Sequence, residues 1–322
     1  EGTIINCISN VDISSVSGDT LLEVAKARGD NGDSIGGLAG DNNGTIKIES
    51  SQNVFAENNV VSVVAGKNYV GGIIGYNDTE GTLEGYALGG GYLSGSRFVG
   101  GICGINLSSN LFESELSASP NKIEGDYYVG GIAGGNLIAL DIKSGSVEKN
   151  IKCNVNNFLG TIEANGAFAG GYFGYNHSFY QGAAKEHITE TIEELAGIDE
   201  STIMDIANWS DPSEKVNMFT LVINEEYQAG TVLGSITAPL YVGGVIGQNT
   251  NDTQLKIMNV TNQTPVSATA FVQNDEYGEG KAYSYAGGII GYVGENVVID
   301  NCSNSGRGEV LTQGTYTGGL AE

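Results

Sequence analysis

A short glycine-rich stretch recurs along the chain and limits its fold more than any other feature. It is clearest as Tyr-Val-Gly-Gly-Ile-Ile-Gly-Tyr-Asn at residues 69–77. Close variants occupy residues 98–106, 128–136, 168–176, 241–249 and 285–293, a weaker copy opens at residue 34, and the chain ends inside another that opens at residue 316. Recurrence at a period of roughly thirty residues is typical of solenoids, in which each repeat stacks only on its neighbours.

The residue types in each copy predict a strand. A β-branched or aromatic residue opens the copy, and Asn and Gly bound it. Glycine inside a strand usually marks a close backbone neighbour, here the equivalent strand one coil away at about 4.8 Å. Two consecutive positions are expected to form buried columns. They hold Leu38, Ile73, Ile102, Ile132, Tyr172, Val245, Ile289 and Leu320, followed by Ala39, Ile74, Cys103, Ala133, Phe173, Ile246, Ile290 and Ala321.

An asparagine closes most copies and is expected at a corner of the coil. The residues at this position are Asn42, Asn77, Asn106, Asn136, Asn176 and Asn249. Asn tolerates turn conformations, and stacked Asn side chains can hydrogen-bond one another along the axis.

The segments between copies supply further short strands. In the last coil these are residues 296–306, which alternate in polarity and end in an Asn/Gly corner, and residues 309–314. The same order recurs before the copies that open at residues 69, 98 and 128. It predicts an all-β parallel β-helix (β-solenoid) of about eight three-strand coils, forming a single domain over residues 1–322.

Two segments interrupt the period. Residues 18–27 fit either a lengthened strand or a short helix, and an insertion at about residues 182–235 is partly helical. In the insertion one apolar face at helical spacing holds Ala184, Ile188, Ile192, Leu195 and Ala196. Gly197 is expected to end this helix, a second short helix is expected at 199–206, and a strand returns at 220–224. We expect the helix to pack on the rod as a lid; the alternative is a dedicated binding subdomain.

The formal net charge of −24 excludes whole classes of partner. No basic face for nucleic acid or for anionic lipid is expected, and no apolar run is long enough to span a membrane. We interpret the acidity as a source of solubility. Acidic, Gly-containing turns at residues 30–33 and 41–45 are also of a kind that can bind Ca²⁺, although neither completes a calcium-loop motif, and turn chemistry explains them without a metal.

The reactive side chains form no catalytic pattern. Cys7, Cys103, Cys153 and Cys302 make no CxxC pair and are expected to be free, buried thiols. His177 and His187 are too few and wrongly spaced for a metalloprotease helix. No column of carboxylates with Arg or Lys recurs in successive coils, so we predict that the chain is not an enzyme.

The repeated Tyr-Val-Gly-Gly-Ile-Ile/Ala-Gly-x-Asn, with Asn-Cys-x-Asn-x-Gly before it, resembles the GLUG repeat family. That family occurs in large bacterial cell-surface and secreted proteins, including adhesin-like proteins and non-catalytic regions of some immunoglobulin A peptidases. The resemblance covers most of the chain outside the helical insertion. It implies a structural repeat and carries no catalytic residues. This chain departs from the pattern at Ser34, at Val293 and at the bulky Tyr172 and Phe173.

The resemblance and the repeats together lead to three hypotheses. The first is a structural or adhesive segment of a bacterial cell-surface or secreted protein, acting as a rigid stalk or as a rod that presents a ligand-binding face to a glycan or a surface protein. The second is a self-assembling extracellular filament subunit, and the third is a carbohydrate-active β-helix enzyme. Because the chain begins and ends inside repeats, we expect a fragment of a longer polypeptide. Tyr76, Tyr175 and Tyr292 are expected to be exposed at the variable corner of the coil, where they could stack on sugar rings, although isolated tyrosines are also ordinary at a protein surface.

Overall fold

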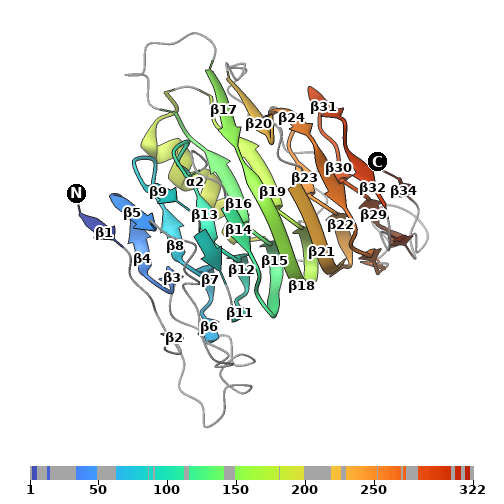
Figure 1. The fold of residues 1–322 in the computed structure, drawn as a ribbon, viewed down its shortest axis with the longest axis horizontal. Helices are drawn as coiled ribbons and strands as arrows, with labels where there is room; N and C mark the ends of the chain where they lie inside the picture. The colour runs from blue at the N-terminus through green and yellow to red at the C-terminus, as the bar shows by residue number, and fades with distance from the viewer. Residues whose placement is uncertain are drawn as a thin grey trace.

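The computed structural model is a parallel β-helix whose coils follow one another from the N-terminus to the C-terminus (Figure 1). The structure describes residues 2–5, 13–14, 34–48, 63–85, 87–89, 91–111, 116–140, 149–180, 182–198, 219–225, 230–251, 253–269, 271–272, 282–305, 309–312 and 316–319. Nearly all strand pairs in this part of the chain are parallel and join one coil to the next, as the repeats predict.

One face of the rod is a seven-stranded sheet built from the second half of each glycine-rich copy. Its strands are β4 (Ala39–Asn42), β8 (Ile74–Asn77), β13 (Cys103–Asn106), β16 (Ala133–Ile138), β19 (Phe173–Ser178), β23 (Ile246–Asn249) and β30 (Ile290–Tyr292).

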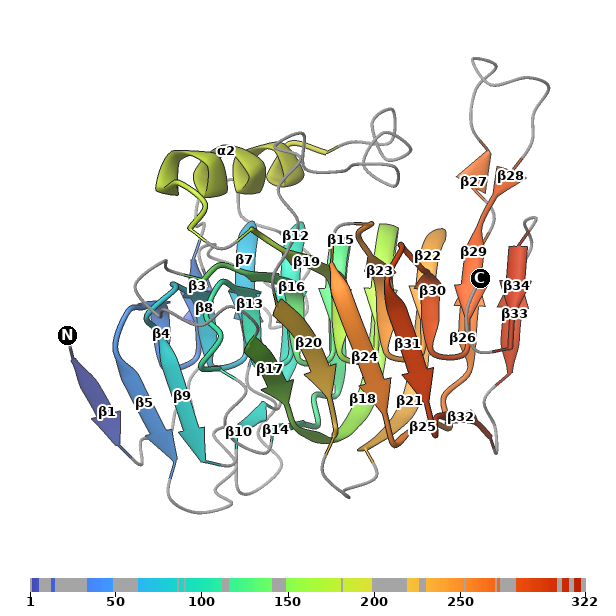
Figure 2. The same ribbon diagram turned by 90° about the horizontal axis from the view of Figure 1, so that it is seen from above.

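The next face around the coil holds a three-stranded and a four-stranded sheet (Figure 2). The first contains β1 (Thr3–Ile5), β5 (Thr45–Ile48) and β9 (Thr82–Gly85), and the second contains β17 (Lys149–Cys153), β20 (Phe219–Ile223), β24 (Gln254–Met258) and β31 (Val297–Asp300).

An eighteen-stranded sheet closes the coil. One row of it contains the first half of each copy and comprises β3 (Ile35–Gly36), β7 (Asn68–Gly71), β12 (Arg97–Gly100), β15 (Lys122–Gly130), β18 (Val155–Gly170), β22 (Leu240–Gly243), β29 (Tyr285–Gly287) and β34 (Tyr316–Gly318). The long strands β15 and β18 begin well before their copies, so they also pair with strands in the rest of the sheet. The other members are β2 (Ile13–Ser14), β6 (Val63–Ala65), β10 (Ala87–Gly89), β11 (Tyr92–Ser94), β14 (Leu116–Ala118), β21 (Gly230–Ala238), β25 (Val260–Asn262), β26 (Val266–Ala268), β32 (Ser303–Asn304) and β33 (Val310–Thr312).

Each glycine-rich copy that the structure describes in full forms two strands joined by a corner, and the prediction of one strand per copy was wrong. In the copy at residues 69–77, β7 ends at Gly71 and β8 begins at Ile74, in a different sheet. A Cβ on Gly71 would lie 1.8 Å from the carbonyl oxygen of Ile74, so only glycine permits this bend. The second glycine meets the next coil: a Cβ on Gly101 would lie 2.1 Å from the oxygen of Gly131.

The corner explains how two consecutive residues can both be buried. Within a straight strand neighbouring side chains point to opposite faces, but Ile73 and Ile74 both lie in the core. The predicted columns are confirmed, with the second position at Cys103 and Ala133 fully buried, while Leu38 and Ala39 pack at the margin and Leu320 and Ala321 lie outside the described residues.

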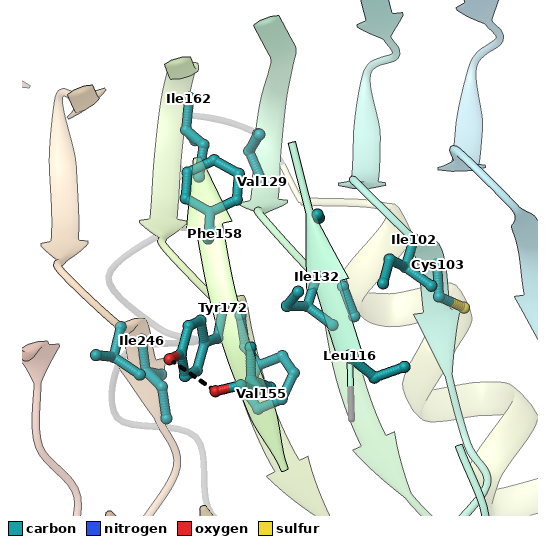
Figure 3. Packing of buried hydrophobic residues seen from close by; sticks show 14 of the residues in the cluster. Ile102, Cys103, Leu116, Val129, Ile132, Val155, Phe158, Ile162, Tyr172 and Ile246 are labelled. Carbon is teal, nitrogen blue, oxygen red and sulfur yellow. Dashed lines mark hydrogen bonds between the residues drawn. The ribbon is translucent and has the colours of Figure 1, made fainter. Parts of the chain in front are cut away.

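Apolar side chains fill the space between the sheets (Figure 3). Ile102, Ile132 and Tyr172 occupy the first column in three successive coils, and Ile246 lies in the second column of the coil that follows. The Tyr172 hydroxyl donates a hydrogen bond to the carbonyl oxygen of Val155 at 3.4 Å, so its polar tip is satisfied inside the core. Burial of such columns is the main favourable term in folding.

The corner asparagines form a continuous hydrogen-bonded ladder, as the sequence predicts. The Nδ2 of each donates to the Oδ1 of the next, at distances between 2.7 and 2.9 Å. The members are Asn42, Asn77, Asn106, Asn136, Asn176 and Asn249. All are buried, so this is a row of satisfied amides inside the fold.

The insertion contains α2 (Lys185–Ala196), which ends at Gly197 as predicted. The insertion is shorter than residues 182–235, because β20 already pairs with β17 and β21 with β18. A second excursion was not predicted: β27 (Phe271–Val272) and β28 (Ala282–Tyr283) form an antiparallel pair that leaves the coil (Figure 2). The predictions for residues 18–27, 30–33 and 199–206, and for Cys7, lie outside the described residues.

We expect Asn136→Ala to destabilise the protein by about 3 kcal/mol. The substitution removes the acceptor for Asn106 and the donor for Asn176, which leaves two buried amide groups with a lost partner. The free energy of unfolding from urea titration measures the effect. The matched control is Asn157→Ala at an exposed position, expected to change that free energy by less than about 0.5 kcal/mol. Equal effects of the two substitutions would contradict a structural role for the ladder.

Candidate functional site

A second apolar cluster lies outside the coil, over the seven-stranded sheet. The aromatic residue that opens a copy has a left-handed backbone conformation in five copies, at Tyr69, Phe98, Tyr128, Phe168 and Tyr241, with φ between 46° and 67°. These rings point away from the core and stack in register, with centroids 4.4 Å apart between Phe98 and Tyr128 and 5.0 Å between Tyr128 and Phe168. The stack continues to Tyr69 at one end and through Tyr241 to Tyr285 at the other.

The helix α2 lies over the N-terminal half of the rod (Figure 2), and its apolar side chains pack in the same cluster as the stacked rings. Its buried residues are Thr191, Ile192 and Leu195, and the two apolar ones belong to the same cluster as the stacked rings. The guanidinium of Arg97 donates a hydrogen bond to the carbonyl oxygen of Ile198 and lies 5.3 Å from the ring centroid of Tyr127. The prediction of a lid packed through its apolar stripe is confirmed.

The three tyrosines expected at the surface have different environments. The expectation of exposure was wrong for Tyr175, which is fully buried because it packs edge-on against Tyr128 and Phe168 in the column that α2 covers. Tyr76 and Tyr292 are half-buried, and each packs edge-on against the last stacked ring at its own end, Tyr69 and Tyr285.

Tyr76 lines a pocket of about 590 Å³ between the coil turns and the beginning of α2. Proteins bind small ligands in concave sites of this size. The coil side of the pocket holds Asn43, Tyr76, Asp78, Thr79, Glu80, Leu107, Ser109, Asn110, Ala139 and Leu140, and the insertion side holds Gly182, Ala183, Lys185, Ile188 and Thr189. Tyr292 is not among the lining residues, so only one of the three predicted tyrosines reaches this site.

The asparagine ladder fixes the turns that form the pocket wall. Asn77 Nδ2 donates to the oxygen of Gly81, which closes the turn containing Asp78 and Glu80. Asn106 Nδ2 donates to the oxygen of Ser108, and the Ser108 N–H donates to Asn106 Oδ1. The wall is therefore held by buried hydrogen bonds before any ligand arrives.

The insertion side is tied to the coil through its backbone. The N–H of Gly182 donates to the oxygen of Leu140 at 2.9 Å. Ala184 is the N-cap of α2 and has no side-chain oxygen, so it cannot accept hydrogen bonds from the first turn of the helix. A helix N-terminus without a cap faces the pocket and favours hydrogen-bond acceptors.

The charged groups of the pocket are Asp78, Glu80 and Lys185. Burial, and then the nearby Asp78 carboxylate, raises the pKa of Tyr76 far above its ordinary value of about 10. The Tyr76 hydroxyl therefore stays protonated and available as a donor at physiological pH. Together the lining offers one aromatic ring, several hydroxyl and amide groups and two carboxylates.

The remaining sequence candidates have structural roles. Asn42 belongs to the ladder and its Oδ1 accepts a hydrogen bond from the N–H of Gly44, so turn chemistry accounts for residues 41–45. Among the described residues no group of three His, Cys, Asp or Glu side chains is placed to hold a metal. His177 is buried with Nδ1 3.0 Å from the hydroxyl of Thr250.

The cysteine prediction holds in part. Cys103, Cys153 and Cys302 carry free thiols, and the first two are buried as expected, whereas Cys302 is only half-buried. Burial raises the pKa of the Cys103 and Cys153 thiols well above the ordinary range, which makes them poor nucleophiles.

Comparison of the chain with models of protein families, with curated proteins and with solved structures gives no match. In the part of the chain that the structure describes, no helix is long and apolar enough to cross a membrane.

We expect the stability of the protein to fall as the pH rises above about 10. Burial raises the pKa of Tyr76, Tyr128, Tyr172 and Tyr241 in the folded state. Their stabilising contribution is complete below the unfolded pKa of about 10 and is lost as the pH rises through the folded values. Tyrosinate absorbance should appear together with loss of the β-sheet circular dichroism. Titration of all tyrosines near pH 10 with the fold intact would contradict this.

We expect Leu195→Asp to release α2 while the rod stays folded. The new carboxylate would lie in an apolar contact, and local unfolding should speed proteolysis within residues 182–198 by about tenfold or more. Limited proteolysis with mass spectrometry measures the rate, and circular dichroism follows the rod. Glu190→Ala on the exposed face of α2 is the control and should leave the rate unchanged. Global unfolding of Leu195→Asp would show that the lid and the rod form one cooperative unit.

Proposed function

We propose that this chain is a rigid, ligand-presenting segment of a bacterial cell-surface or secreted protein. The observation that carries the proposal is the asparagine ladder, whose hydrogen bonds join successive coils and also hold the wall of an open pocket. A stack joined in this way resists bending, and the pocket gives it a place for a ligand. The sequence resemblance to the GLUG repeat family supports the bacterial extracellular setting.

The dimensions of the fold fit a role in presenting a ligand-binding surface better than a role as a spacer that only adds length. A solenoid advances about 4.8 Å for each coil of roughly thirty residues, whereas an extended chain advances about 3.3 Å for each residue. A solenoid therefore gains little length for each residue, and this chain forms a broad, stiff surface instead. The strongly acidic composition keeps such a surface soluble.

The test of this proposal is surface display of the parent protein. An antibody raised against the 322-residue chain should label intact bacterial cells that express the parent gene, and brief treatment of those cells with protease should remove the signal. Labelling only after the cells are permeabilised would reject the proposal. Sedimentation of the purified chain gives a separate answer about the filament hypothesis, which requires growth into longer particles as the concentration rises.

A further inference from the structure

We infer that the pocket beside α2 is a binding site for an uncharged saccharide, with Tyr76 as the ring on which a sugar stacks. This deepens the ligand-presenting part of the proposed function and rests on it. The site combines a hollow of about 590 Å³ with a preorganised aromatic ring and a polar lining. No other described tyrosine lines this pocket.

Tyr76 is held in place as a platform. Its ring packs edge-on against Tyr69, with centroids 5.6 Å apart and planes at 79°. On the strand itself, β8 pairs with β4 and β13, and Asn77 directly after Tyr76 belongs to the ladder. A ring held by this contact and by a strand that is paired on both sides loses little conformational entropy when a ligand stacks on it.

The polar lining matches the hydroxyl groups of a sugar ring. Asp78 and Glu80 supply acceptor carboxylates, and Ser109, Asn110 and Thr189 supply groups that both donate and accept. Thr79 lies between the two carboxylates, and its N–H donates to Asp78 Oδ1 at 2.8 Å, which orients that carboxylate. The uncapped first turn of α2 adds backbone donors on the opposite side.

The charge of the site favours a neutral ligand. Two carboxylates and one lysine give the pocket an excess of negative charge, and Asp41 lies next to Tyr76 in register on the neighbouring strand. The whole chain carries a net charge of −24. Sialylated, sulfated or uronic-acid sugars would therefore be repelled, while a neutral pyranose gains hydrogen bonds without an electrostatic cost.

The experiment begins with the purified 322-residue chain on a panel of oligosaccharides ending in glucose, galactose, mannose, fucose or N-acetylglucosamine, alongside sialylated and sulfated analogues. Calorimetric titration then gives the affinity for the best neutral binder. We expect saturable binding of at least one neutral saccharide, with little dependence on salt concentration. Absence of neutral binders, or binding of anionic sugars alone, would overturn the inference.

Variants then place the binding in the pocket. Tyr76→Ala should weaken the affinity for the neutral binder about tenfold or more, because it removes the stacking surface, whereas Tyr76→Phe should keep most of it. Tyr292→Ala is the matched control, since Tyr292 occupies the same register position and packs on Tyr285 in the same way, outside the pocket. Equal loss in Tyr76→Ala and Tyr292→Ala would overturn the inference.

A second variant, at a surface position, tests the site even if Tyr76→Ala fails to fold. Glu80 is exposed, so Glu80→Ala should leave thermal unfolding unchanged while lowering the affinity about fivefold to tenfold through a lost charge-assisted hydrogen bond. Glu190→Ala, exposed on α2 and outside the lining, should bind normally. If no variant changes binding, the pocket is not the site. If no saccharide binds but intact cells are still labelled, this inference fails and the proposed function stands.

Discussion

The fold depends on backbone and side-chain hydrogen bonding between adjacent coils in parallel register. Each sheet is continuous only along the axis, so each coil is held by its two neighbours. The asparagine ladder adds a buried amide contact to that register, and the same amides close the turns that follow the strands. One set of side chains holds both the spacing of the coils and the shape of the turns. The turns at the outer surface of the rod are therefore as regularly spaced as the buried asparagines.

The glycines and the aromatic residues of the repeat solve one geometric problem together. The chain must turn sharply twice within a few residues, and the glycine pair at Gly71 and Gly72 allows the turn into the next sheet. Just before it, the left-handed residue Tyr69 sends its ring outward. Left-handed conformations are costly for aromatic residues. Stacking of the rings, and their packing with α2 in one apolar cluster, offset this cost.

The features that depend on the repeat could be predicted from the sequence. The features that depend on the segments interrupting the repeat could not. The coil register, the buried columns and the asparagine ladder follow from residues that recur at equal positions, and α2 follows from its own periodicity. Two adjacent buried residues, Ile73 and Ile74, already implied a bend inside each copy. The pocket and the burial of Tyr175 arise where α2 docks on the coils, and no local pattern in α2 specifies where it docks. The excursion at β27 and β28 occurs once, so no repeat reveals it.

The direction of the asparagine ladder has a consequence for how such a protein can evolve. The amides from Asn42 to Asn176 donate toward the C-terminal neighbour, and those from Asn77 to Asn249 accept from the N-terminal one. A duplicated coil would bring its own donor and acceptor and would fit between two existing coils without leaving an amide unpaired. Gene duplication can therefore lengthen the stack one coil at a time at little cost in stability, whereas a coil without the asparagine would break the series at a single point. Selection would then tolerate a change in the number of coils, because the stability of the stack would change little.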